Sequence, residues 1–141
     1  MIFNKNFEKI RLEDIYDFVS SILKIPEKRI FCLYGNLGSG KTTISKEMIK
    51  QLTGINTATS PTFNIVQIYE GNGIVVYHYD LYRLRDESEL YEIELLENLG
   101  DKAYVIIEWP ELAEKHLSGL TTRMNLKIEI DGEDSRTITI S

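Results

Sequence analysis

The stretch Tyr34–Thr43 reads YGNLGSGKTT. Gly35, Gly40, Lys41 and Thr42 fit the pattern G-x-x-x-x-G-K-[ST] at every position. Glycines at these positions allow a tight turn, which brings backbone N–H groups close to a phosphate chain. The motif therefore predicts a phosphate-binding loop, and with it the class of fold that carries such a loop.

The flanks of the motif support this interpretation. The apolar run RIFCLY (29–34) is typical of a strand buried on both faces, and TTISKEMIKQLTG (42–54) predicts a helix that ends at Gly54. The helix N-terminus adds a positive potential, Lys41 adds a charge near the β- and γ-phosphates, and Thr42 offers a hydroxyl to Mg²⁺. We expect the Lys41 side chain to be exposed when no nucleotide is bound.

The rest of the chain alternates between helical and strand patterns. We expect an N-terminal helix over 11–23, ended by Pro26. After the motif we expect a loop that enters a strand (60–71), a strand that ends at Asp80 (73–80) and a helix ended by Gly100 (87–100). A third strong strand (103–109) and a hairpin (124–140) follow. This order predicts a single α/β domain over residues 1–141, with a P-loop NTPase-like three-layer fold. Its central sheet is expected to be mostly parallel, with antiparallel additions that include the C-terminal β-hairpin.

Two carboxylates follow the strands of this predicted sheet. GIVVYHYD ends in Asp80, and AYVIIEW contains Glu108 near its end. Ligands of open α/β sheets bind beyond the carboxyl ends of the strands, so both acids are candidate catalytic and metal-binding residues, together with Thr42 as a metal ligand. The sequence does not decide which acid holds Mg²⁺ and which orients the attacking water.

Several further residues have both a functional and an ordinary structural interpretation. Ser60–Phe63 (SPTF) has the place of a nucleotide-sensing loop, in which Thr62 is a catalytic candidate, although a simple Ser-Pro turn has the same pattern. Trp109 follows Glu108 directly, which favours a functional role. The two histidines, His78 and His116, lack metal-ligand neighbours in the sequence and are interpreted as structural, and Cys32 as a core residue.

Composition narrows the classes of partner. The net charge is −6, which argues against broad electrostatic binding to nucleic acid and favours protein partners and a small ligand. No apolar run approaches the roughly 20 residues that span a bilayer, and the N-terminus has no signal-peptide pattern, so a cytoplasmic location is expected. The guanine motif Asn-Lys-x-Asp is absent, which leaves adenine as the default base.

Four motifs occur in an order that resembles the TsaE (YjeE) family of bacterial P-loop ATPases: GNLGSGKTT, SPTFNIV, YHYDLYRL and VIIEWPE. The resemblance covers 34–111, and it implies ATP and Mg²⁺ as ligands. It implies metal ligation near Thr42 and Glu108 with Asp80 close by, and a switch-like loop that contains Ser60 and Thr62. The residues that it implies for nucleotide binding are Gly35, Leu37, Gly38, Ser39, Gly40, Lys41, Thr42, Thr43 and Trp109.

The family serves the synthesis of threonylcarbamoyladenosine in tRNA, and the resemblance implies a TsaD–TsaB-type protein complex as the partner. Two residues differ mildly from those usual in the family: Ser39 stands where Ala is usual, and Tyr79 where Phe is common. Two alternatives remain open. A small nucleoside or nucleotide kinase is one, since Arg83 and Arg85 lie near Asp80 in the sequence; an ATP sensor that does not hydrolyse its ligand is the other.

Overall fold

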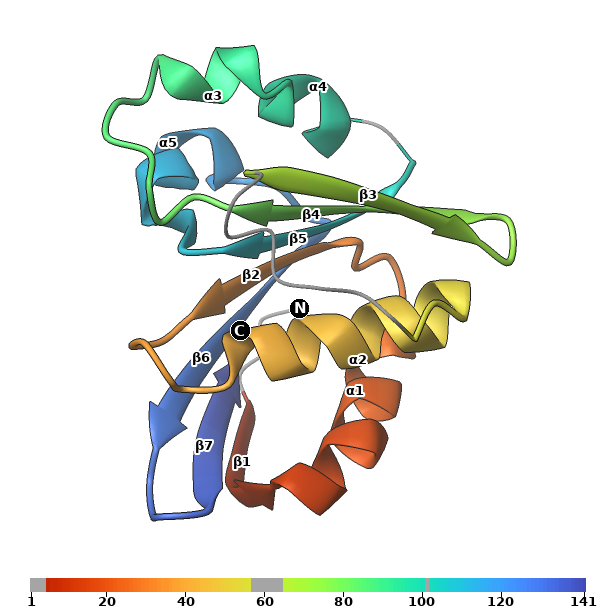
Figure 1. Ribbon diagram of the computed structural model, residues 1–141, viewed down its shortest axis with the longest axis vertical. Coiled ribbons are helices and arrows are strands. Elements are labelled where there is room, and N and C mark those ends of the chain that lie inside the picture. Colours follow the sequence, from red (N-terminus) through yellow and green to blue (C-terminus); the bar gives the residue numbers. More distant parts are fainter. Residues whose placement is uncertain (1–4, 57–64, 101) are drawn as a thin grey trace.

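The computed structural model describes residues 5–56, 65–100 and 102–141, and within them the strands form one seven-stranded sheet (Figure 1). The strand order is β1-β7-β6-β2-β5-β4-β3. In chain order the strands are β1 Lys5–Arg11, β2 Ile30–Tyr34, β3 Val66–Gly71, β4 Ile74–Asp80, β5 Tyr104–Glu108, β6 Arg123–Ile130 and β7 Ser135–Ile140.

The centre of the sheet is parallel. Strand β2 pairs in parallel with β5 and β6, and β5 pairs in parallel with β4, whereas β3, β7 and β1 are added antiparallel. The carboxyl ends of β2, β4 and β5 therefore lie at one edge of the sheet, with Asp80 in register with Glu108. The expected mostly parallel sheet with a C-terminal hairpin, here β6 and β7, is confirmed.

Helices cover both faces of the sheet, which gives the expected three layers (Figure 1). Helices α1 (Ile15–Leu23) and α2 (Lys41–Thr53) pack on one face. The short helices α3 (Glu89–Glu92), α4 (Leu95–Leu99) and α5 (Glu114–Leu117) lie on the other. Among the described residues, no helix combines the length and the apolar character needed to cross a membrane.

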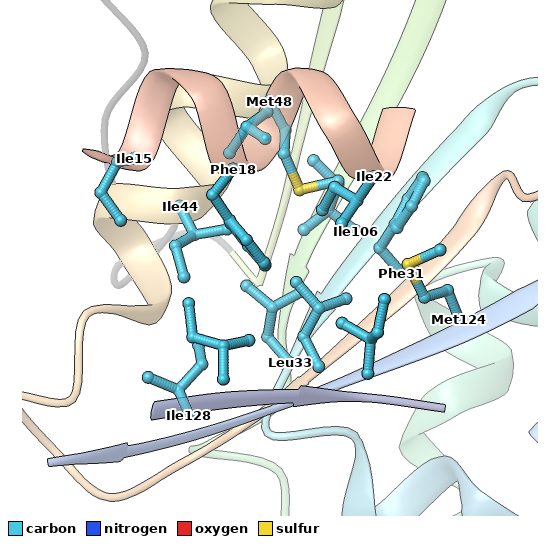
Figure 2. Packing of buried hydrophobic residues seen from close by; sticks show 14 of the residues in the cluster. Ile15, Phe18, Ile22, Phe31, Leu33, Ile44, Met48, Ile106, Met124 and Ile128 are labelled. Carbon is cyan, nitrogen blue, oxygen red and sulfur yellow. The ribbon is translucent and has the colours of Figure 1, made fainter. Parts of the chain in front are cut away.

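Alternation along the buried strands decides which face each residue joins. Phe31 and Leu33 of β2 point toward α1 and α2, where they meet Phe18 and Met48 (Figure 2). Burial of each such side chain contributes about 1.5–3 kcal/mol. Cys32, between them, points to the other face, where burial raises the pKa of its thiol to about 12. Its interpretation as a core residue is confirmed.

Strand β1 was not expected from the sequence. It pairs antiparallel with β7, and its register shifts between Phe7 and Ile10 around Lys9, which has a φ of 53°. Because of this bulge, the two residues that pack on the core are three apart instead of two. The strict alternation that identifies a strand in a sequence is therefore missing.

The helix expected over residues 87–100 is interrupted. It forms α3 and α4, separated at Glu94, which has a left-handed conformation with a φ of 55°. The hydroxyl of Tyr79, on the sheet below, donates to the carbonyl oxygen of Ile93 at 3.2 Å. This tertiary contact gives the Ile93 carbonyl a partner outside the helix, so the turn is stabilised where the local pattern predicts continuous helix.

Candidate active site

The glycine-rich motif, which is predicted to bind phosphate, forms a tight turn between β2 and α2. Gly40 precedes α2 with a φ of 108°, a conformation that side chains disfavour. A Cβ atom on Gly35 would lie 2.5 Å from Ser39 Oγ and 2.8 Å from the carbonyl oxygen of Ile128, so only glycine fits there. The residue that precedes α2, Gly40, has no side chain to cap the first turn of the helix. The first N–H groups of α2 are thus available to an anion.

Lys41 differs from the expectation of an exposed side chain. It is only 5% exposed. Its Nζ donates to the carbonyl oxygens of Gly35 at 2.5 Å and Asn36 at 3.1 Å, and lies 4.0 Å from the centre of the Trp109 ring. Burial lowers the pKa of Lys41, while Glu108 and Asp80 oppose that shift. The loop itself supplies hydrogen-bond partners of the ammonium group.

Trp109 covers this lysine from the end of β5. Its backbone is left-handed, with a φ of 57°, and Pro110 follows it in the 3₁₀ helix Pro110–Ala113. Its ring lies 4.8 Å from that of Tyr82, which is an exposed residue. A left-handed conformation costs energy for a bulky residue, and the sharp turn places the indole over Lys41.

Glu108 is buried at the end of β5 and is hydrogen-bonded through both oxygens. The Thr42 hydroxyl donates to its Oε1 at 3.0 Å, and the Ser45 hydroxyl lies 3.2 Å from its Oε2. Oε2 is also 2.5 Å from Nε2 of His78. Burial alone would raise the pKa of Glu108, but the hydrogen bonds from His78, Thr42 and Ser45 outweigh it and hold the pKa below its usual value.

Asp80, the second acid, has a different environment. It is half-buried, and its Oδ1 accepts the backbone N–H of Tyr82 at 3.0 Å. Burial raises the pKa of Asp80; the hydrogen bond from the Tyr82 amide opposes this, and the nearby Glu108 adds to it. Two carboxylates in register thus have opposite pKa shifts, which is frequent where the two groups have different chemical tasks.

A cavity of about 440 Å³ brings these groups together. Of the residues predicted to bind nucleotide, all but Gly35 line it, as do Asp80 and Glu108; the full lining is Leu37, Gly38, Ser39, Gly40, Lys41, Thr42, Thr43, Asp80, Tyr82, Arg83, Glu108 and Trp109. Ser60 and Thr62 lie outside the described residues. Arg83 lines the cavity, whereas Arg85 does not.

A second cavity, of about 470 Å³, shares Ser39, Gly40 and Thr43 with the first. Its lining combines apolar and charged side chains. The apolar ones include Ile10, Leu12, Ile15 and Ile138, and the charged ones are Arg11, Glu13, Glu133, Asp134 and Arg136. Arg136 closes one side, and its guanidinium donates to the carbonyl oxygens of Ser39 at 2.8 Å and Gly38 at 3.2 Å. The sequence did not reveal this cavity, because its walls come from the bulged strand β1 and from the C-terminal hairpin.

The two histidines have different positions. His116 lies beside Glu87, on the face covered by α3 and α5, with Nε2 and Oε1 2.9 Å apart. His78 contacts Glu108, so the interpretation of this residue as only structural missed a contact with a candidate catalytic acid. The available signal was position: His78 is two residues before Asp80 and therefore shares its strand face.

Comparisons with known proteins identify relatives over most of the chain. A sequence model of the family described as "Threonylcarbamoyl adenosine biosynthesis protein TsaE" matches residues 10–138. The tRNA threonylcarbamoyladenosine biosynthesis protein TsaE of Rickettsia typhi is 42% identical over 100 residues, which is 70% of this chain and 69% of that protein. The TsaE proteins of Bacillus subtilis and Haemophilus influenzae are 35% and 31% identical, over 79% and 86% of this chain and 68% and 76% of theirs.

The fold has a counterpart among solved structures. The crystal structure of Bacillus subtilis YdiB superposes with a TM-score of 0.74, over 99% of this chain and 86% of that one, at 24% sequence identity. This similarity supports the fold, and the family match supports a part in tRNA threonylcarbamoyladenosine biosynthesis. The chain belongs to the TsaE family.

Proposed function

We propose that this protein binds and hydrolyses ATP in the presence of Mg²⁺, and that hydrolysis drives turnover of a TsaD–TsaB-type complex during tRNA threonylcarbamoyladenosine synthesis. One observation carries the proposal: a single cavity is lined by the phosphate-binding loop, its lysine and two carboxylates. Positioning and electrostatic stabilisation are what phosphoryl transfer requires of a protein.

The phosphate chain would occupy this cavity. The uncapped N–H groups of α2 would donate to phosphate oxygens, and Lys41 would exchange its bonds to Gly35 and Asn36 for bonds to the phosphates. The adjoining cavity would take adenine, because several apolar side chains line it next to the loop. The Arg136 contacts to Ser39 and Gly38 would hold the loop between the two cavities.

The donor set fits Mg²⁺. The Thr42 hydroxyl and the carboxylates of Glu108 and Asp80 offer oxygen atoms, the kind of donor that this ion prefers, and Thr42 and Glu108 are hydrogen-bonded to each other. When bound, Mg²⁺ would neutralise charge that develops on the phosphates. Because Glu108 holds Thr42, we assign it to the metal side, and we assign Asp80, which has the raised pKa, to orientation of the attacking water.

Hydrolysis does work only if ATP and ADP give the protein different affinities for something else. Tyr82 and Leu37 are exposed at the mouth of the phosphate cavity, so a partner that contacts them would sense the nucleotide. The net charge of −6 favours a protein partner over direct binding to tRNA.

We expect the isolated chain to be a slow ATPase that the TsaD–TsaB-type pair accelerates. The measurement is ADP release with and without the pair, together with titration of the pair in the presence of ATP, ADP or a non-hydrolysable analogue. Tighter docking with ATP than with ADP, and faster ADP release, would support the coupling. Equal affinity in all three states, with no gain in ADP release, would contradict it.

The same assays test the two alternatives. Transfer of phosphate to a nucleoside or nucleotide would indicate the kinase, for which Arg83 in the cavity wall is the favouring observation. ATP binding without ADP release, with both partners present, would indicate the sensor.

The single tryptophan offers a direct test of phosphate binding. Because Nζ of Lys41 lies 4.0 Å from the Trp109 ring, phosphates that draw the ammonium away should change the indole fluorescence. We expect ADP and ATP to shift the emission in a saturable way, and adenosine, which has no phosphate, to leave it unchanged. An equal response to adenosine would show that the lysine contact is not what the signal reports.

A further inference from the structure

His78 occupies a place that packing alone does not explain. It is fully buried on β4, between the sheet and α2, and its Nε2 lies 2.5 Å from Oε2 of Glu108. Its other ring nitrogen, Nδ1, has no hydrogen-bond partner among the described residues. The ring therefore has one polar contact in the described part of the chain, and that contact is with an acid of the candidate site.

The two oxygens of Glu108 have different partners. Oε1 accepts the hydroxyl of Thr42 at 3.0 Å. Oε2 lies near Ser45 and His78, but the Ser45 hydroxyl has one hydrogen and is closer to the carbonyl oxygen of Lys41, at 2.9 Å, than to Oε2, at 3.2 Å. When the ring carries its hydrogen on Nε2, His78 donates to Oε2 alone. The Ser45 hydroxyl, by contrast, has a backbone carbonyl as a competing acceptor.

We propose that His78 is a positioning residue: it holds Oε2 of Glu108 so that Oε1 stays directed at the hydroxyl of Thr42. A carboxylate that is fixed on one oxygen can orient the hydroxyl that serves as a metal ligand, as partners of metal ligands commonly do. Without the imidazole, Glu108 would keep only the shared Ser45 bond on that side and could rotate away from Thr42. This inference rests on the function proposed above, because it assigns Thr42 to Mg²⁺.

Two substitutions separate the role of the ring nitrogen from that of the ring's bulk. His78→Gln keeps an amide N–H near the place of Nε2, whereas the shorter His78→Asn cannot reach Glu108. Val76→Ala is the control, since Val76 is buried on the same face of β4 and packs in the core beneath α2. All four proteins, including the wild type, are titrated with ADP in Mg²⁺ and in EDTA.

We expect Mg²⁺ to raise the ADP affinity of the wild type. In His78→Asn this increase in affinity should be smaller by about tenfold or more, while the affinity in EDTA is unchanged. His78→Gln and Val76→Ala should keep most of the gain. The inference is overturned if His78→Asn keeps the wild-type gain, or if Val76→Ala loses as much. If the wild type itself shows no Mg²⁺-linked affinity, the proposed function fails, which is a different result.

A second measurement works without nucleotide and covers the case in which His78→Asn is too unstable to titrate. The free energy of unfolding is measured for His78→Leu, which keeps apolar bulk but has no N–H for Glu108, for Glu108→Gln and for the double variant. We expect the two effects to be non-additive, because the side chains share a contact. Additive effects would overturn the inference.

Discussion

Replacement of Lys41 by alanine is expected to weaken ATP binding about 10- to 100-fold. A hydrogen bond to a charged group contributes about 1.5–3 kcal/mol, which corresponds to this range of affinity. Titration calorimetry measures the loss. Because Lys41 is buried, the variant also loses the hydrogen bonds to Gly35 and Asn36 and the contact of the ammonium group with the Trp109 ring. We therefore expect the free energy of unfolding to fall by about 1 kcal/mol.

Lys46→Ala is the matched control for this experiment. Lys46 lies on the same helix and is exposed, so its replacement removes the same charge without touching the phosphate cavity. We expect its ATP affinity to stay near that of the wild type. Equal losses in the two variants would mean that general charge, and not the loop lysine, binds the phosphates.

Glu108→Gln is expected to lower partner-stimulated hydrolysis by about 100-fold or more, as does the loss of one group that stabilises charge in a transition state. Glutamine keeps the shape of the side chain and a carbonyl oxygen for Thr42, but it removes the negative charge on the metal side of the site. Part of the Mg²⁺-linked affinity should fall too, yet the loss of hydrolysis should exceed the loss of binding, because the acid acts mainly in the transition state. ADP release and calorimetry on the same preparation compare the two.

Asp80→Asn should also lose hydrolysis, with affinity close to that of the wild type, since its oxygen can still accept the Tyr82 amide. Glu111→Gln serves as the control for charge, because Glu111 acts electrostatically on Lys41 and does not line the phosphate cavity. Wild-type hydrolysis in Glu108→Gln or in Asp80→Asn, under full stimulation by the partner pair, would show that the role assigned to that acid is wrong.

Much of the fold was predictable from local patterns. Runs such as RIFCLY and AYVIIEW are apolar across their central residues, as expected for strands buried on both faces, and the structure confirms them as the central strands β2 and β5. The break between α3 and α4 was not predictable in this way. It depends on the Tyr79 hydroxyl, which comes from a strand on the sheet and reaches Ile93 only in the folded chain.

The candidate site was also predictable only where its residues lie in one local segment. The motif with Gly35, Gly40 and Lys41 was predictable because its residues are contiguous. A turn followed by a helix places the loop amides without contacts from distant segments. The positions of Asp80 and Glu108 at strand ends followed from strand patterns alone. The roles of these residues in binding and hydrolysis stay predictions.

The sequence by itself determined the glycine-rich loop, the strand and helix that flank it, and the two acids at strand ends, because each is encoded within one local segment. Only the tertiary structure decided that His78 contacts Glu108, that Trp109 covers a buried Lys41, and that β1 and the C-terminal hairpin enclose a second cavity. These features join residues far apart in the chain, and their geometry depends on strand register, a bulge and a left-handed turn. Local propensity does not encode such contacts; the packing of the whole domain sets them.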